Sequence, residues 1–554
     1  MAWKPRRLES GRHFAGGSII GALPRTPNAI RPWLCAAAIL VAVLYGYGLD
    51  HAPMYLDGDE AHFGIQAYSL AHAGRDLAGH FLPVFVNLWD PLGDSKPQEQ
   101  NDARRRVWYQ PFLFYLIALV LKVRPLSEGS IRIPTAIIGG LINPILVYGI
   151  GVRVVQRRSF AAAAALLVAA SPAHFILARE ALDYICPLPF VLVWLWCVVT
   201  YVEGGSDWLP AIGGLALGVG VFTFIASWIL MPLYLATSWV AYALAGRDAR
   251  RATLRATAAF LVPIALAAPW IWTHPEVLRD IAARYLASAG SGIKLSVLRD
   301  KVGEYWDYFN PAYLFLSGGV SLTTSTGRAG ILPLAAAVLL PLGLYDLITR
   351  EVSPAIRAAL LAGLLIAPVP ATLFGERYMV QRELVVVPFA ALLATFGLAW
   401  LARQRCKAVR WLAPLLVAAA GAQFVAVHRD YFTHYQRRAA FWYDPVTIRG
   451  AVQPIVSAVG RGEMPAVYLS RALDDGGPKW RFYMAKHDCV DLLSRTRYFD
   501  EPSELAAAPP GAYAIVYANP RPDALLADGR WTITTLVRDV DDRDASIVLR
   551  KAHQ

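Results

Sequence analysis

Long apolar segments recur along the chain, and they restrict its fold more than any other feature. Of the 554 residues, 56% are hydrophobic and only 17% are charged, which is too apolar for an ordinary soluble domain. A helix needs about 20 apolar residues to cross a bilayer. We therefore predict a mainly α, polytopic bundle of about eleven transmembrane helices. The predicted spans are 32–49, 131–152, 159–178, 184–202, 208–225, 227–245, 255–273, 329–348, 356–374, 380–402 and 409–427.

The placement of basic residues predicts the side of the membrane that each loop occupies. The formal charge of +12 would suit a nucleic-acid-binding protein, but the arginines form short clusters between apolar segments, as topogenic charges do. We therefore expect no nucleic-acid partner. With a cytoplasmic N-terminus, the cytoplasmic loops are 153–158, 203–207, 246–255, 349–357 and 403–410. The outer segments are then 50–130, 179–183, 274–328, 375–379 and everything after about residue 428.

One apolar run, 111–123, does not fit this alternation. Its 13 residues make about 20 Å of helix, which is too short to cross the hydrocarbon core. Counting it as a span would also move every later basic loop to the outside. We interpret it as a re-entrant or interfacial helix. The five cysteines have no paired spacing, so neither a disulfide framework nor a zinc motif is predicted.

The end of the chain has a different character. The segment 429–554 is polar, with strand-like runs at 466–469, 512–517, 532–537 and 546–549, and with helical patterns at 446–459 and 501–508. Strands that alternate with helices indicate a small α/β domain. We therefore divide the chain into a transmembrane domain, 1–428, whose outer loop 50–130 carries the candidate chemistry, and a soluble domain, 429–554, on the outer face.

An acidic cluster directly follows the first span. Asp57, Asp59 and Glu60 lie within four residues and precede a helical pattern that we expect to lie flat at the membrane surface. One interpretation is structural, because aspartate is a good helix N-cap. The other is catalytic: a partly desolvated carboxylate at the bilayer edge can have a raised pKa and act as a base.

Two further outer loops carry charge at the ends of spans. Arg179 and Asp183 lie between the third and fourth spans, either as an ion pair one helical turn apart or as part of a site that includes the acidic cluster. Arg377 and Arg382 open the tenth span. Arg382 either extends its guanidinium outward to water or binds an anion such as phosphate.

A third basic group has no topogenic explanation. Arg104, Arg105 and Arg106 lie in the outer loop, close before Tyr109, where the positive-inside rule does not require cations. They are candidates for binding a lipid phosphate. An equally good alternative is contact with anionic membrane headgroups.

These residues resemble bacterial glycosyltransferase family 39, of the GT-C class, which includes protein O-mannosyltransferases and the lipid A aminoarabinose transferase. The family has an Asp-Glu pair that begins a juxtamembrane helix after the first span, as Asp59 and Glu60 do here. The run 111–123 is similar to a second juxtamembrane helix. Further similarities are Arg132-Ile133-Pro134, the aspartate Asp183 that opens the fourth span, Phe309-Asn310-Pro311, and Arg377-Tyr378 with Arg382 and Pro388.

The resemblance implies transfer of a sugar from a polyprenyl-phosphate donor to a lipid, glycan or protein acceptor, on the outer side of the bacterial inner membrane, with inversion. Asp59 would take the acceptor proton, while Glu60 and Asp183 orient the acceptor or tune Asp59. Outer arginines, Arg382 first, would neutralise the leaving phosphate. No cofactor is required, although Asp57, Asp59 and Asp183 could hold a divalent metal. We expect a monomer in contact with membrane lipids.

One position departs from the family. The aminoarabinose transferases carry a lysine before the proline pair that opens the last juxtamembrane helix, and this lysine contacts the lipid phosphate. Here the segment reads Trp108-Tyr109-Gln110-Pro111. Either Arg104 to Arg106 or Arg382 supplies the cation, or the donor is held differently. The chain is therefore not expected to be an aminoarabinose transferase.

Two other functions share parts of this pattern. A lipid-linked sugar flippase or transporter would also be polytopic, but it should carry ionisable residues in the middle of its spans, and here charge gathers at the outer loops. An O-antigen ligase or polymerase would use a similar donor. Its key charges are usually arginine and histidine, without an acidic pair after the first span.

Overall fold

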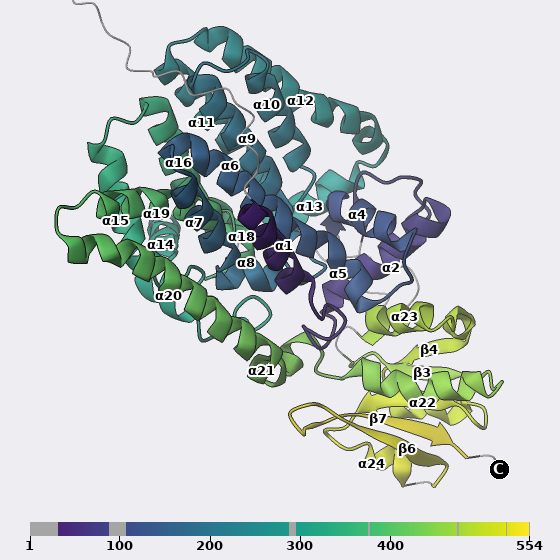
Figure 1. The fold of residues 1–554 in the computed structure, drawn as a ribbon. Helices are drawn as coiled ribbons and strands as arrows, with labels where there is room; N and C mark the ends of the chain where they lie inside the picture. The colour runs from purple at the N-terminus through teal and green to yellow at the C-terminus, as the bar shows by residue number, and fades with distance from the viewer. Residues whose placement is uncertain are drawn as a thin grey trace, which may run out of the picture.

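The computed structural model describes residues 32–87, 107–286, 295–374, 377–473, 476–527 and 529–552. It is mainly helical, and in Figure 1 the apolar helices form one body with a small sheet domain at one end. Six helical segments are long and apolar enough to cross a membrane: Glu128–Val155, Asp183–Val202, Ser227–Ala245, Ala249–Thr273, Pro354–Phe374 and Lys407–Phe432. Shorter apolar helices are Pro32–Gly46, Phe112–Leu121, Arg158–Ala169, Leu209–Gly220, Ala336–Thr349 and Val386–Ala402.

All eleven predicted spans coincide with apolar helices. The elements, in chain order, are α1 (Pro32–Gly46), α5 to α6 (Glu128–Val155), α7 (Arg158–Ala169) with α8 (Pro172–Leu177), η2 (Asp183–Ile185) with α9 (Pro187–Val202), α10 (Leu209–Gly220), α11 (Ser227–Ala245), α12 (Ala249–Thr273), α15 (Ala336–Thr349), α16 (Pro354–Ile366) with α17 (Val369–Phe374), α18 (Val380–Glu383) with α19 (Val386–Ala402), and α20 (Lys407–Phe432). The amphipathic helices α13 (Glu276–Leu286) and α14 (Leu295–Asp307) lie between α12 and α15, in the segment predicted to be an outer loop.

Small residues bring the bundle helices into close contact. A Cβ atom at Gly214 of α10 would lie 2.0 Å from the carbonyl oxygen of Ala256 on α12, and one at Gly343 of α15 would lie 2.0 Å from that of Leu393 on α19. Neither pair could pack this way with a side chain at the glycine. Such close backbone approach is typical of helix packing in membranes, where apolar burial alone gives little attraction.

The short apolar helix α4 (Phe112–Leu121) has ten residues and a length of about 15 Å. It is therefore too short to span the membrane, as predicted. Its buried side chains, which include Leu113, Phe114 and Ile117, pack against α2 (Gly58–Ala73) and α5. The ring of Phe114 stacks on that of Phe63 at 4.2 Å between centroids.

The helix α2 begins where the sequence predicts, and its position at the membrane surface stays a prediction. Most of its residues are buried, because α4 covers one side and α23 (Gly476–Lys486) covers another. Gln66 is also buried, and its side chain bonds the backbone of Leu77 and Asn87. The sequence pattern shows an amphipathic helix but not the domain that covers its polar side.

The C-terminal domain contains a five-stranded sheet in the order β4-β3-β5-β7-β6. Its strands are β3 (Val467–Ser470), β4 (Thr496–Phe499), β5 (Tyr513–Tyr517), β6 (Trp531–Arg538) and β7 (Asp544–Lys551). The predicted small α/β domain is confirmed, with β3 parallel to both β4 and β5 and with antiparallel pairing of β7 to β5 and β6. Strand β4 and helix α23 were not predicted.

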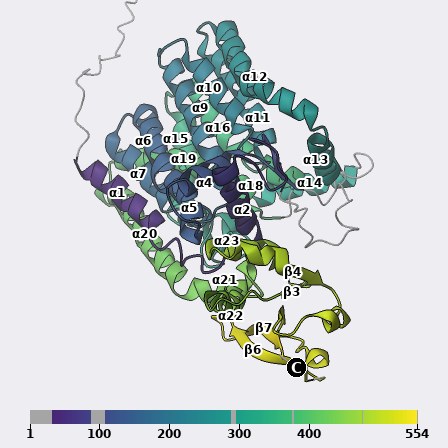
Figure 2. The ribbon, with the colours of Figure 1, turned by 90° about the vertical axis from the view of Figure 1, so that its right-hand side faces the viewer.

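This domain packs on the membrane bundle through a few elements. Helix α21 (His434–Tyr443) leads from α20 to α22 (Ile448–Gly460), and α23 lies on α2. Figures 1 and 2, at right angles to each other, both place α23 between the sheet and α2. The domain thus covers the segment that carries the acidic cluster.

Candidate active site

The acidic cluster forms the first turn of α2. Asp57 is the N-cap: its side chain accepts the N–H of Asp59 at 2.9 Å, while the Glu60 carboxylate accepts the N–H of Asp57 at 3.2 Å. This capping box satisfies amides that have no partner within the helix. Asp57 is therefore the helix N-cap that the structural interpretation predicts. The same hydrogen bonds fix the backbone position of Asp59.

Glu60 is fully buried and paired with Arg132 of α5. The guanidinium donates from Nε to Oε1 and from Nη2 to Oε2, each at 2.8 Å. Arg132 also donates to the carbonyl oxygens of Leu49, Pro53 and Tyr55. The buried Glu60–Arg132 pair therefore stabilises the loop between α1 and α2.

Arg179 holds the same loop from the other side. It is buried, and its guanidinium donates to the carbonyl oxygens of Tyr45, Tyr47 and Ala52 at 2.6 to 2.8 Å. It also lies over the ring of Phe432, 4.8 Å from the centroid. Arg179 therefore binds the C-terminal end of α1, and the expected ion pair with Asp183 is not formed.

The two loops predicted to lie on the outer face converge, as the catalytic interpretation requires. The Oε1 atom of Glu60 accepts the backbone N–H of Ala181 at 2.7 Å, which joins the first turn of α2 to the loop before η2. Asp183 opens η2 and is close enough to Asp59 for their charges to interact. Asp183 is fully buried, and neither carboxylate oxygen accepts a hydrogen bond from another described residue.

Asp59 is half-buried and receives a hydrogen bond from Tyr109. The Tyr109 hydroxyl, on the two-residue strand β2 (Trp108–Tyr109), donates to Oδ2 at 2.8 Å. Burial, and then the Asp59 charge, raise the pKa of Tyr109, so the hydroxyl keeps its proton and remains a donor. The ring of Tyr109 packs edge-on against Phe63 of α2 at 5.2 Å. Tyr109 therefore orients the Asp59 carboxylate.

Asp57 has a raised pKa. Burial, followed by the neighbouring Asp59 charge, raises the pKa of Asp57 to about 8, while Lys479 opposes the shift. Adjacent carboxylates in one site push their pKa values apart in this way.

Within the part of the chain that the structure describes, no three His, Cys, Asp or Glu side chains are placed to hold a metal ion. Asp57, Asp59 and Asp183 are therefore not gathered into the ligand set considered from the sequence.

Two of the predicted phosphate-binding arginines have partners within the protein. Arg377 is exposed and forms an ion pair with Asp307 of α14 at 2.7 Å. Arg382 is half-buried: it donates to the carbonyl oxygen of Phe374, and its guanidinium lies 5.9 Å from the ring centre of Tyr285 on α13. Its helix, α18, packs against η2. The three arginines Arg104, Arg105 and Arg106 lie outside the described residues.

Sequence reasoning missed several groups that border the site from the C-terminal part of the chain. Lys479 of α23 is buried; its ammonium donates to the Tyr443 carbonyl oxygen at 2.9 Å, lies 3.4 Å from the Asp444 carboxylate and acts electrostatically on Asp57. The Tyr443 hydroxyl donates to Glu180, which is also buried. No local pattern marks these residues, because their role depends on how the domain packs.

The chain is similar to a known protein family and to solved structures. Residues 109–273 match the family model for dolichyl-phosphate-mannose-protein mannosyltransferase. Among solved structures, ArnT from Cupriavidus metallidurans bound to undecaprenyl phosphate aligns with a TM-score of 0.55 at 15% identity, covering 93% of this chain and 97% of that one. The apo form of the same enzyme aligns with a TM-score of 0.56, with the same identity and coverage. No curated protein matches the sequence significantly.

The match and the alignments agree with one another. The family model covers Tyr109 of β2, α4 to α12 and the loop that holds Asp183, and the alignments extend the common fold over nearly the whole chain. The family match and the shared fold together confirm the resemblance to the GT-C membrane glycosyltransferases that the sequence indicates.

Proposed function

We propose that this protein transfers a sugar from a polyprenyl-phosphate donor to a hydroxyl group of a lipid, glycan or protein acceptor, with Asp59 as the general base. The observation that carries the proposal is the contrast among three neighbouring carboxylates. Asp57 caps α2 and Glu60 is buried against Arg132, whereas Asp59 is half-buried and oriented by Tyr109. The relative whose title records bound undecaprenyl phosphate supports the donor class.

The reaction is a single displacement at the anomeric carbon. The acceptor oxygen forms a bond to this carbon as the bond between the carbon and the phosphate oxygen breaks, so the configuration inverts. The acceptor proton passes to Asp59, and the bonding electrons leave with the polyprenyl phosphate. A phosphate leaving group needs its charge neutralised more than it needs a proton, and Arg382, whose helix packs on η2, is the proposed source of that charge.

Asp183 is the proposed contact for the acceptor or the sugar. Its buried carboxylate has no hydrogen-bonding partner from another described residue, and such a group is costly unless a ligand supplies donors. Glu60 and Arg179 receive a different role from the one expected. They position the loop that carries Asp59, because their contacts are with Arg132 and with backbone carbonyl groups.

The membrane arrangement is part of the proposal. We place the transmembrane domain, 1–428, in the bacterial inner membrane with a cytoplasmic N-terminus. The domain 429–554 then lies on the outer face, and the protein acts as a monomer. The charge pattern of the loops supports this orientation. The contacts of the C-terminal domain with the loop after α1 agree with it, because both must lie on one side.

The proposal is tested first by identifying the product and then by removing the base. Mass spectrometry of surface glycolipids and glycoproteins, with and without the gene, should reveal one glycoform that depends on it. Membranes that carry Asp59→Asn should still bind the polyprenyl-linked donor, but transfer should fall at least about a hundredfold, as expected for loss of a general base. Full transfer by this variant would exclude Asp59 as the base.

Asp57→Asn is the matched control. Asparagine caps helices as well as aspartate does, so α2 should keep its first turn. Because Asp57 carries a cap and not the acceptor proton, this variant should retain most of the transfer activity.

A further inference from the structure

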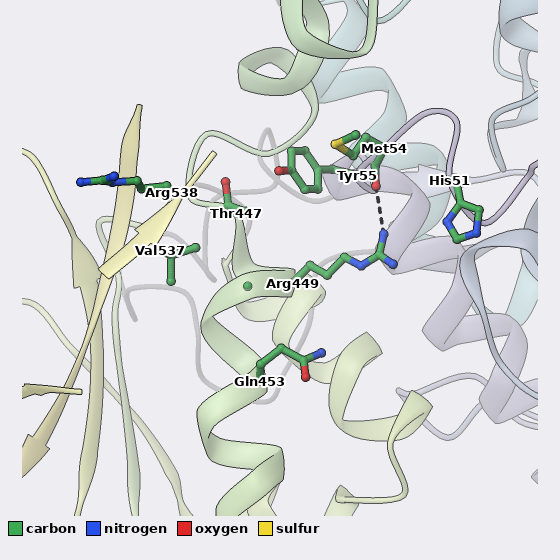
Figure 3. A pocket seen from close by; sticks show the side chains of 9 residues that line it. His51, Met54, Tyr55, Thr447, Arg449, Gln453, Val537 and Arg538 are labelled. Atoms are coloured by element: carbon green, nitrogen blue, oxygen red, sulfur yellow. Dashed lines mark hydrogen bonds between the residues drawn. The ribbon is translucent and has the colours of Figure 1, made fainter. Parts of the chain in front are cut away.

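A pocket of about 400 Å³ lies between the loop after α1 and the C-terminal domain. This volume falls in the range of small-ligand pockets, about 300–1,000 Å³. Figure 3 shows that one wall is the loop His51 to Tyr55 and that the opposite wall is the start of α22, with β6 at the side. The lining residues are His51, Met54, Tyr55, Thr447, Arg449, Gly450, Gln453, Val537 and Arg538.

Arg449 spans this pocket with most of its donors available. Its side chain extends from α22 toward the loop, and Nη1 makes one long bond, 3.3 Å, to the carbonyl oxygen of Met54 (Figure 3). Among the described residues it has no ion-pair partner. A guanidinium carries five N–H donors in a planar fork that matches phosphate and carboxylate. The remaining N–H groups are therefore available to an oxyanion.

The rest of the lining fits the same chemistry. No carboxylate lines the pocket, while His51 faces the end of the Arg449 side chain and Gln453 lies one helical turn farther along α22 (Figure 3). The second arginine of the lining does not compete for this role, because Arg538 directs its guanidinium away from the pocket and pairs with Asp544. The anion would therefore be bound by Arg449.

The walls are held in place without a ligand. The Tyr55 hydroxyl donates to the buried Asp539 at 2.8 Å, which ties the loop to the C-terminal domain. On the other side, α22 lies against β6 because position 450 is glycine: a Cβ there would be 2.6 Å from Cγ1 of Val537. A preformed site loses little free energy to ordering when a ligand binds.

From this geometry we propose that the pocket binds a phosphate or carboxylate group on the sugar acceptor, with Arg449 as its anchor. The inference rests on the proposed function and names a chemical feature of the acceptor. Tyr55 lies four residues before Asp59, and four residues span at most about 14 Å. An acceptor anchored by its anionic group at Arg449 can therefore extend a hydroxyl toward the proposed base.

The test uses the full chain in phosphatidylcholine nanodiscs, with inorganic phosphate and glucose 6-phosphate as probes and glucose as the neutral control. Calorimetric titration should show saturable binding of both anions and none of glucose. Arg449→Gln should weaken this binding at least tenfold, and Arg449→Lys should weaken it less. Arg461→Gln, at the other end of α22, where Arg461 pairs with Glu463, should bind as the wild type does.

Several outcomes overturn the inference. They are no saturable binding of either anion, equal binding by the wild type and Arg449→Gln, or an equal loss with Arg461→Gln. Unchanged melting of Arg449→Gln without probes shows that the variant is folded, and Arg449→Lys provides a second reading if it is not.

A second arm separates the sources of the anion. If phosphatidylglycerol in the disc competes with the probes, the site accepts lipid headgroups; if it does not, the anion belongs to a glycan. Both results keep the site. The binding test does not depend on sugar transfer. If no anion binds, the Asp59→Asn transfer test still stands, and if Asp59→Asn keeps full transfer, the anion-binding test still stands.

Discussion

Asp57 and Asp59 are two residues apart, yet the fold gives them different tasks. Asp57 accepts the amide of Asp59 and has a pKa of about 8, whereas Asp59 receives the hydroxyl of Tyr109. At neutral pH a protonated Asp57 adds no negative charge beside Asp59. Charge separation of this kind allows one of two neighbouring carboxylates to act as a base.

The raised pKa of Asp57 predicts a pH dependence of stability. The folded state holds this proton up to about pH 8, whereas the unfolded chain releases it near about pH 3.9. The stabilisation is therefore complete below about pH 4 and is lost as the pH rises through about 8. The free energy of unfolding should fall by less than about 1.4 kcal/mol per pH unit, because Asp57 is half-buried. Between pH 5 and 9, the midpoint temperature of thermal unfolding should fall more steeply with pH for the wild type than for Asp57→Asn. Parallel curves would contradict the assignment.

The buried pair of Glu60 and Arg132 predicts a large structural effect. Glu60→Ala leaves a buried guanidinium without its carboxylate and should lower the free energy of unfolding by about 3–5 kcal/mol. Replacing both residues, as Glu60→Leu with Arg132→Met, should recover part of this loss. Denaturant unfolding of the purified protein measures both effects. As a control, Glu203→Ala removes a partly exposed pair with Arg153 and should cost less than about 1 kcal/mol.

For single residues, the sequence locates the important positions well but does not assign their roles. The density of acid after the first span correctly marks a convergence point of two loops. The roles of Glu60 and Arg179 could not be predicted, because their partners are backbone carbonyls and Arg132, 72 residues from Glu60. A short polar segment gives no sign of which distant group it will contact.

At the scale of elements, the contact of α2 with α23 positions the candidate site. A Cβ at Gly64 of α2 would lie 2.8 Å from the ring of Phe482 on α23. Both residues are buried, so the ring has no free space to move into. The absence of a side chain at position 64 allows the C-terminal domain to approach the helix that carries Asp59.

This contact predicts that Gly64→Ala is destabilising, although alanine favours helices. Overpacking against Phe482 should cost about 1–3 kcal/mol, and Phe482→Leu in the same chain should recover part of it. Gly421→Ala in α20 is the matched control: nothing lies within 4 Å of its added Cβ, and alanine should stabilise the helix by up to about 1 kcal/mol. Thermal unfolding measures both. Equal effects at positions 64 and 421 would contradict the close contact.

Elements with a strong apolar pattern are those that the sequence predicts well. The eleven predicted spans and α4 all coincide with apolar helices, and six of the spans are long and apolar enough to cross a membrane, because the bilayer sets both length and hydropathy. Helix α23 is missed since Lys479 and Arg481 interrupt its apolar pattern, yet both are buried. Strand β4 is missed because it is a short edge strand with little alternation.

At the scale of the whole molecule, the C-terminal domain completes the site. The bond from Tyr55 to Asp539 joins residues 484 positions apart, and Lys479 and Tyr443 reach the acidic groups from the same domain. The sequence predicts a small α/β domain on the outer side, but its packing on α2 depends on shape and on pairings that no local pattern contains. If the domain lies outside, the candidate site does too.

The orientation can be tested with a cysteine that the chain already has. Cys406 is exposed in a predicted cytoplasmic loop, and the backbone N–H groups of Val409 and Ala408 lower the pKa of its thiol. A larger thiolate fraction makes it reactive toward maleimides. A membrane-impermeant maleimide should therefore label Cys406 only after spheroplasts are lysed.

In a chain with Cys35→Ser and Cys406→Ser, a cysteine replacing the exposed Arg497 of β4 should be labelled in intact spheroplasts. The opposite pattern would place the C-terminal domain and the acidic cluster in the cytoplasm and overturn the proposed orientation.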